Sequence, residues 1–179
     1  YNNDTLEDFA GMFRYSKLIE AVNDADTSIL SNITTVKMYK YFTPTLNSGL
    51  KYTLSYNNAL YNPHSGHNSS GGGVISSSGF KVNNDSSLNE HFLDDDGAGN
   101  LRLYYLSGTA RVYTDATYGT VDYATGEVVL TSAHITSISN IDGASSTQVR
   151  VFATPSSNDI VPVRNQVLSI DTSNSSITG

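Results

Sequence analysis

Cysteine and tryptophan are both absent from this 179-residue chain, and charged residues make up only 15% of it. Without cysteine, the fold has no disulfide bond, no thiolate metal ligand and no cysteine nucleophile. Lys and Arg together number 10 against 17 Asp and Glu, so the formal net charge is −7. A chain this acidic lacks the basic surface that nucleic acids or an anionic membrane require. We therefore expect neither nucleic acid nor membrane among its partners.

Long apolar runs are missing as well. No segment approaches the roughly 20 apolar residues of a membrane-spanning helix. The sequence also does not start with the charged-then-apolar pattern of a signal peptide. The first residue is Tyr1 rather than Met, so we interpret the chain as an internal or trimmed piece of a longer protein.

The abundant residues are those of β-structure. The chain has 12 Tyr and 14 Gly, with many Thr, Ser and Asn. Tyr, Thr and Val favour strands, whereas Asn, Gly, Asp and Ser favour the turns between them. This composition is typical of β-rich proteins that pack against neighbouring subunits, and equally of carbohydrate-binding β-sandwiches.

Helical periodicity is confined to the N-terminal region. One apolar stripe recurs at i, i+3, i+4 and i+7: Tyr15, Leu18, Ile19 and Val22. Thr5 and Asp8 have the spacing of a capping box upstream of it. The acidic residues after Asn23 oppose the helix dipole, so we expect the helix to end there.

After Asn32 the pattern changes to the two-residue period of strands. We predict strands at residues 33–42, 50–57, 74–77, 80–82, 101–106, 110–114, 119–123, 127–131, 135–141, 147–154 and 163–170. A hairpin turn at 124–126 has Gly126 to supply a positive φ. Residues 57–73 form a long loop, which we expect to be functional or mobile. The predicted fold class is mainly β (α+β), an antiparallel sandwich-like domain with a short N-terminal helical segment.

Three parts follow from this pattern. Residues 1–46 are predicted to form a helix-plus-strand segment that continues from a missing N-terminal half. Residues 47–173 form the β-rich domain, and 174–179 form a flexible tail.

The run Asp94-Asp95-Asp96-Gly97 could suit calcium, which prefers oxygen ligands around a glycine turn. In the EF-hand pattern, however, Ala98 falls at the third ligand position and Tyr105 replaces the bidentate Glu. We therefore interpret the run as an acidic turn that leads into the strand at 101–106. We expect that metal has no structural role.

Other candidate chemistry is also incomplete. His64 and His67 lie three residues apart in the long loop, but zinc needs a third ligand on a rigid platform. No G-x-S-x-G elbow is present, and the glycines at 71–73 lack the Lys and helix of a phosphate loop. We predict no cofactor and no enzymatic activity, a secreted hydrolase being the least favoured function.

Two prolines, Pro155 and Pro162, bracket a turn that contains Asp159. Pro162 fixes the exit from the turn, and Arg164 then reaches a carboxylate such as Asp159 or Asp171, or backbone carbonyls. An ordinary proline-defined connection is an equal alternative. The structural or interface candidates here are Asp159, Pro162, Arg164 and Asn165.

The strand at 101–106 supplies two further candidates, Tyr104 and Tyr105. Arg102 is its one charged residue, and Tyr offers contact area at low entropic cost. Many short strands leave edges, and Lys81 is the one Lys after Lys51 that could blunt them. We predict a two-fold homodimer formed through a largely uncharged β surface.

Six stretches, in order along most of the chain, carry a resemblance to a known family: DTSILSN at 26–32, YNPH at 61–64, LDDDG at 93–97, LYY at 103–105, GTVDYATG at 119–126 and SNDIVPVRNQ at 157–166. The chain resembles the C-terminal half of the larger baseplate wedge subunit of T-even-like contractile-tailed phages, which is related to the baseplate J family. The resemblance implies a virion structural protein with no catalytic residues to carry over.

In that family, paired copies link neighbouring wedges into a ring around the central hub, and the ring rearranges when the sheath contracts. The resemblance implies location in the tail baseplate after assembly in the bacterial host cytoplasm. The implied partners are a second copy and the other wedge and hub proteins. The alternative is a carbohydrate-binding β-sandwich of a receptor-binding tail module, with tyrosines that stack on sugars: Tyr61, Tyr104, Tyr105 and Tyr113.

Overall fold

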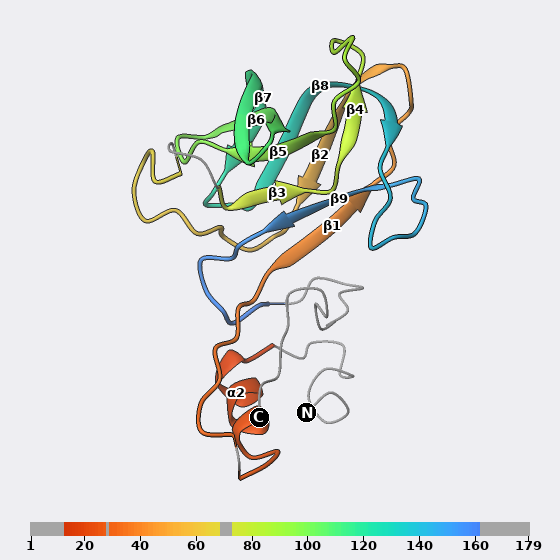
Figure 1. Ribbon diagram of the computed structural model, residues 1–179. Coiled ribbons are helices and arrows are strands. Elements are labelled where there is room, and N and C mark those ends of the chain that lie inside the picture. The colour runs from red at the N-terminus through yellow and green to blue at the C-terminus, as the bar shows by residue number, and fades with distance from the viewer. Residues whose placement is uncertain (1–12, 28, 69–72, 162–179) are drawn as a thin grey trace. The chain divides into compact units, whose positions relative to one another are not determined.

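The computed structural model describes residues 13–27, 29–68 and 73–161 (Figure 1). The chain divides into two compact units, the first made of Tyr1–Val36 with Ser157–Gly179 and the second of Lys37–Ser156. This division differs from the predicted boundary at 46, because the first strand belongs to the β unit and the chain returns to the first unit at Ser157. The predicted tail at 174–179 lies outside the described residues.

The first unit contains helix α2 (Tyr15–Asn23), whose bounds match the predicted apolar stripe. Next to it, the backbones of Phe13 and Ile160 exchange two hydrogen bonds of 3.1 Å each. The predicted capping box at Thr5 and Asp8 lies outside the described residues. No helix in the described part of the chain is long and apolar enough to cross a membrane.

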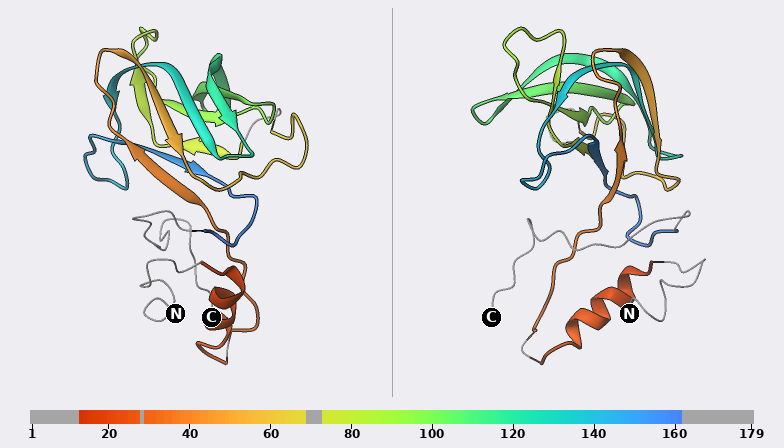
Figure 2. Two further views of the ribbon diagram at one scale, coloured as in Figure 1. Left: turned by 180° about the vertical axis from the view of Figure 1, so that it is seen from behind. Right: turned by 90° about the vertical axis from the view of Figure 1, so that its right-hand side faces the viewer.

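The second unit contains two antiparallel sheets (Figures 1 and 2). The smaller has the order β1 (Met38–Phe42), β9 (Val149–Ala153) and β3 (Ile75–Ser77). The larger has the order β2 (Gly49–Ser55), β8 (Glu127–Ile138), β4 (Phe80–Val82), β5 (His91–Asp95), β6 (Asn100–Ser107) and β7 (Ala110–Asp122). Strand β8 also pairs with β7, so the sheet closes on itself into a barrel-like core.

The core is built from alternate residues of these strands. In β9, for example, Val149, Val151 and Ala153 are fully buried, while the residues between them are only partly covered. Seven apolar residues of the larger sheet are fully buried: Phe80, Leu93, Leu101, Val128, Leu130, Ala133 and Ile135. Each buried Val, Leu, Ile or Phe side chain stabilises the fold by roughly 1.5–3 kcal/mol relative to exposure.

The predicted mainly β class with antiparallel sheets and one short helix is confirmed. The predicted hairpin is also present, with Gly126 at a φ of 73°. Two pairs of predicted strands are single strands, because β7 spans 110–122 and β8 spans 127–138.

One predicted strand is shorter than expected, one strand was not predicted, and one prediction is untested. The strand predicted at 33–42 is present only from Met38 to Phe42, and Ile33 is 99% exposed. Strand β5 was missed, because its acidic end was interpreted as a turn. The strand predicted at 163–170 lies outside the described residues.

Candidate functional site

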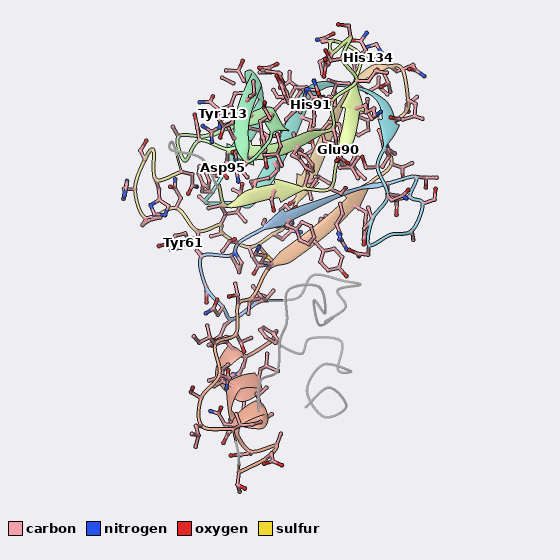
Figure 3. All side chains as sticks on the ribbon, in the orientation of Figure 1. Tyr61, Glu90, His91, Asp95, Tyr113 and His134 are labelled. Carbon is pink, nitrogen blue, oxygen red and sulfur yellow. The ribbon has the colours of Figure 1, made fainter. Side chains whose placement is uncertain are left out.

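Strand β5 places its side chains on two opposite faces, because successive residues of a strand alternate. Leu93 is fully buried on the core side, and its neighbour Asp94 lies on the outer face. Asp94 is directly opposite Arg102 on β6, and Tyr104 is opposite Tyr113 on β7. With Arg111, these residues form what we call the Arg–Tyr cluster: Asp94, Arg102, Tyr104, Arg111 and Tyr113 (Figure 3 labels Tyr113).

The centre of the cluster is the carboxylate of Asp94, which is 1% exposed. Its Oδ1 accepts a hydrogen bond from Arg102 Nε at 2.9 Å. Its Oδ2 accepts from Arg111 Nη1 at 2.6 Å and from the Tyr113 hydroxyl at 2.8 Å. Burying a charge is costly unless it is paired and hydrogen-bonded, and both oxygens meet that requirement here.

Two cation–π contacts hold the rest of the cluster together. Arg102 Cζ lies 4.3 Å from the centroid of the Tyr113 ring, and Arg111 Cζ lies 4.6 Å from that of Tyr104. The two rings are themselves 5.8 Å apart. Such contacts contribute roughly 0.5–2 kcal/mol each, more where water is excluded.

Burial raises the pKa of both tyrosine hydroxyls in the cluster. Burial raises the pKa of the Tyr104 hydroxyl above its ordinary value. Burial, followed by the hydrogen bond to Asp94, raises the pKa of Tyr113. Tyr113 therefore remains a hydrogen-bond donor to the carboxylate at neutral pH.

The solvent-facing part of the cluster is small and mixed in character. Tyr113 is 37% exposed, the Arg111 side chain 33%, and Leu106, directly opposite Arg111, 48%. Tyr and Arg are the residue types that contribute most to protein–protein binding energy. Because contacts within the cluster already fix the inner atoms of Tyr113 and Arg111, these side chains lose little further entropy on association. The arrangement has the chemistry of a contact surface.

Two of the candidates named from the sequence, Tyr104 and Tyr105, lie on β6. Tyr104 is a cluster member but only 8% exposed, whereas Tyr105 lies on the opposite face, half-buried, with its ring 5.8 Å from that of His91. Strand β6 is not an edge strand, because it is paired with both β5 and β7. Arg102, the one charged residue at 101–106, is paired with Asp94.

The other predicted candidates belong to the first unit. Asp159 Oδ1 accepts a hydrogen bond from the Tyr15 backbone N–H at 2.8 Å, at the start of α2. Arg14, the N-cap residue, makes no side-chain capping bond, so Asp159 supplies the acceptor from a distant part of the sequence. Pro162, Arg164 and Asn165 lie outside the described residues, and the Arg164 clamp stays a prediction.

The acidic run was only partly a turn. Asp94 and Asp95 are buried strand residues, whereas the Asp96 carboxylate does form a turn by accepting from the backbone N–H groups of Ala98 and Asn100 at 2.7 and 3.0 Å. The signal that could have located buried Asp94 is the presence of two arginines, Arg102 and Arg111, on the next two strands.

The rings of His64 and His67, the zinc candidates, lie 5.1 Å apart. Within the described ranges, no group of three or more His, Asp or Glu side chains could hold a metal ion. The four tyrosines considered for sugar stacking do not share one surface. Tyr61 lies in the long loop against His67 with ring centroids 5.4 Å apart, and Tyr105 faces away from Tyr104 and Tyr113.

The fold and the cluster thus define a mainly β protein whose built surface is suited to contact with other macromolecules. The family model described as "Baseplate structural protein gp6, C-terminal domain III" matches residues 1–41. This match supports a structural role in a phage baseplate, a location in the virion tail and interaction with other baseplate proteins. No curated protein and no solved structure matches the chain.

Proposed function

We propose that the chain is a non-enzymatic structural subunit of a phage tail baseplate wedge, which links neighbouring wedges into a ring around the central hub. The observation that carries this proposal is the family match over residues 1–41. The ordered stretches of resemblance, including SNDIVPVRNQ at 157–166, favour the larger wedge subunit. In this proposal the subunit assembles in the host cytoplasm and takes part in the switch that triggers sheath contraction.

The Arg–Tyr cluster supports a role in subunit contacts. Its exposed members combine an aliphatic, an aromatic and a cationic side chain: Leu106, Tyr113 and Arg111. We propose that this surface contributes to pairing between copies of the chain. A weak pairwise contact is sufficient in a ring, because linked contacts raise the effective concentration of each partner.

The assembly role is tested in a phage whose gene for this chain carries a stop codon. We expect infected cells to contain hubs and unjoined wedges but no closed baseplate, as seen by negative-stain electron microscopy. Expression of the intact chain from a plasmid should restore closed baseplates. Normal baseplates without the chain would refute the wedge-linking role.

The pairing is tested by sedimentation equilibrium. We expect dimers at roughly tens of micromolar, weakened about tenfold by Arg111→Ala together with Tyr113→Ala. The control is Lys51→Ala with Tyr61→Ala, since both residues are exposed and distant in sequence from the cluster. A monomer up to hundreds of micromolar would contradict the homodimer, and an unchanged dimer in the cluster variant would place the pairing elsewhere.

A further inference from the structure

A groove of about 430 Å³ lies at a second place in the β unit, away from the Arg–Tyr cluster surface. One side is the loop that contains Asn62 and Ser65, the other is the hairpin residues Asp122 and Tyr123, and the turn at 97–99 contributes the rest. Small-molecule sites commonly occupy roughly 300–1,000 Å³, so the groove has room for a small ligand.

The two sides of the groove are tied to one buried carboxylate. Asp95, which is fully buried, accepts hydrogen bonds from the Tyr123 hydroxyl at 2.7 Å and from Asn68 Nδ2 at 2.8 Å (Figure 3 labels Asp95). Its other oxygen accepts from the Ile75 N–H at 2.8 Å. The loop and the hairpin are therefore held in place before any ligand arrives, which lowers the entropic cost of binding.

The turn at 97–99 is in close contact with the loop. The Gly97 carbonyl accepts from the Gly66 N–H at 2.9 Å and from Asn62 Nδ2 at 3.2 Å. Gly97 has a φ of +75°, and a Cβ there would lie 2.6 Å from the Asn68 nitrogen. Only glycine permits this approach, so the shape of the groove depends on it.

The polar atoms in the groove are mainly hydrogen-bond acceptors. Asn62 Oδ1 is shielded from solvent and has no protein hydrogen-bond partner. Hydrogen bonds from Thr125 and from the Ala124 N–H lower the pKa of Asp122, so this carboxylate is ionised at neutral pH. The described residues that line the groove include no Lys or Arg. The groove therefore disfavours phosphate, sulfate or carboxylate groups and favours a neutral ligand rich in hydroxyl donors.

Apolar surface is also present. Val121 and Tyr123 line the same groove, and an aromatic ring with a negative face attracts the polarised C–H groups of a pyranose. We propose that this groove binds a neutral saccharide, with sugar hydroxyls that donate to the Asp122 carboxylate. This inference goes beyond the baseplate role and stands or falls independently of it.

The test is a titration of the isotope-labelled chain with methyl glucoside, methyl galactoside, N-acetylglucosamine, maltotriose and lactose, followed by NMR. We expect at least one to bind with a Kd of about 1 mM or tighter. The shifted amides should be those of the groove, at 62–65, 97–99 and 121–124. Sialyllactose, which carries a carboxylate, should bind at least tenfold more weakly than lactose.

Two variants in the groove, each with a matched control outside it, separate the groove from the rest of the surface. Ala124 is exposed and lines the groove, so Ala124→Trp should fill it and abolish binding, whereas Ala110→Trp on β7 should not. Asp122→Asn should keep the turn, because Asn can accept the same backbone bonds, yet weaken binding about tenfold. Asp115→Asn is its matched control, since Asp115 also accepts a backbone N–H, from Thr117 at 2.8 Å, outside the groove.

The outcomes are decisive in either direction. Saturable shifts at the groove that Ala124→Trp removes and Ala110→Trp retains would establish the site. No saturable binding by any of these sugars at tens of millimolar, tighter binding of sialyllactose, or binding that survives Ala124→Trp would overturn it.

Discussion

Asp94 and Asp95 are adjacent and almost equally buried, yet the two faces of β5 give them different partners. Asp94 is paired with two arginines and Tyr113, all from strands that follow β5 directly. The Asp95 carboxylate accepts from neutral donors, which come from residues 68, 75 and 123, whereas the Asp95 backbone carbonyl accepts from Arg102 Nη2 at 2.8 Å. The Asp94 carboxylate on the outer face thus joins neighbouring strands through ion pairs. The Asp95 carboxylate on the inner face joins segments that are distant in sequence through hydrogen bonds.

The largest effect on stability that we predict concerns Asp94, the carboxylate that is paired with two arginines. Asp94→Ala leaves Arg102, whose side chain is 9% exposed, without its carboxylate. Removing one partner of a buried ion pair costs about 3–5 kcal/mol, and urea denaturation measures this loss. Replacement of both residues, Asp94→Leu with Arg102→Met, should recover much of it. A loss below about 1 kcal/mol for the single variant would show that charge pairing does not stabilise this face.

Asp95→Ala should reduce the free energy of unfolding less than Asp94→Ala does, by about 2–4 kcal/mol. The side-chain partners of Asp95 are neutral, so no buried charge is left without its partner. The Ile75 N–H loses its acceptor, so its hydrogen exchange should accelerate more than that of the β6 amides. The matched control is Asp115→Ala, an exposed carboxylate with a local turn bond. Equal protection of the Ile75 amide in wild type and variant would contradict the anchoring role.

A smaller effect concerns Tyr123, which donates to Asp95 at 2.7 Å. Burial and this hydrogen bond raise the pKa of Tyr123 well above its ordinary value. The folded state therefore favours the neutral phenol, so its contribution is complete below the unfolded pKa of about 10 and is lost as pH rises through the folded pKa.

We expect Tyr123→Phe to cost about 1–2 kcal/mol at pH 7 and to make stability less dependent on pH above about 10. Urea midpoints between neutral and strongly alkaline pH measure both effects. Tyr61→Phe is the control, because Tyr61 is 43% exposed. An identical alkaline profile in wild type and Tyr123→Phe would show that another group controls it.

The smallest effect is expected at an exposed carboxylate in the other unit. Asp159 caps the first N–H of α2, and Asp159→Ala should cost about 1 kcal/mol of helix stability. The exchange rate of the Tyr15 amide measures it directly. Asp159→Asn retains a capping oxygen and should behave like wild type; a similar loss in both variants would mean that charge, not capping, is important.

The comparison also shows where sequence reasoning succeeds. Helix α2 and the hairpin at Gly126 were predicted because their signals are local: an apolar stripe and a residue that tolerates positive φ. The end of β5 was not predicted, since Asp is disfavoured in strands unless a partner neutralises it. Those partners, Arg102 and Arg111, are 8 and 17 residues away from Asp94. Only the pairing register of the strands brings these two arginines to Asp94.

The same limit applies to the two sites. Tyr104 was named from its residue type, but its burial depends on Arg111 and Tyr113 from the next strand. The saccharide groove had no sequence signal, because its two sides meet through hydrogen bonds to the buried Asp95. Hydrogen bonds and ion pairs between residues that are distant in sequence cannot be recognised from the local periodicity of the sequence.

The position of β9 has a consequence for synthesis of the protein. This strand lies between β1 and β3, although it is the last of the nine strands in the described part of the chain. Strand β1 therefore leaves the ribosome about a hundred residues before its hydrogen-bonding partner, which corresponds to roughly 5–20 s of translation. During that interval β1, which carries Tyr39 and Tyr41, lacks its partner strand β9. An unpaired strand is prone to aggregation. We therefore expect the nascent chain to depend on chaperones until β9 has been synthesised.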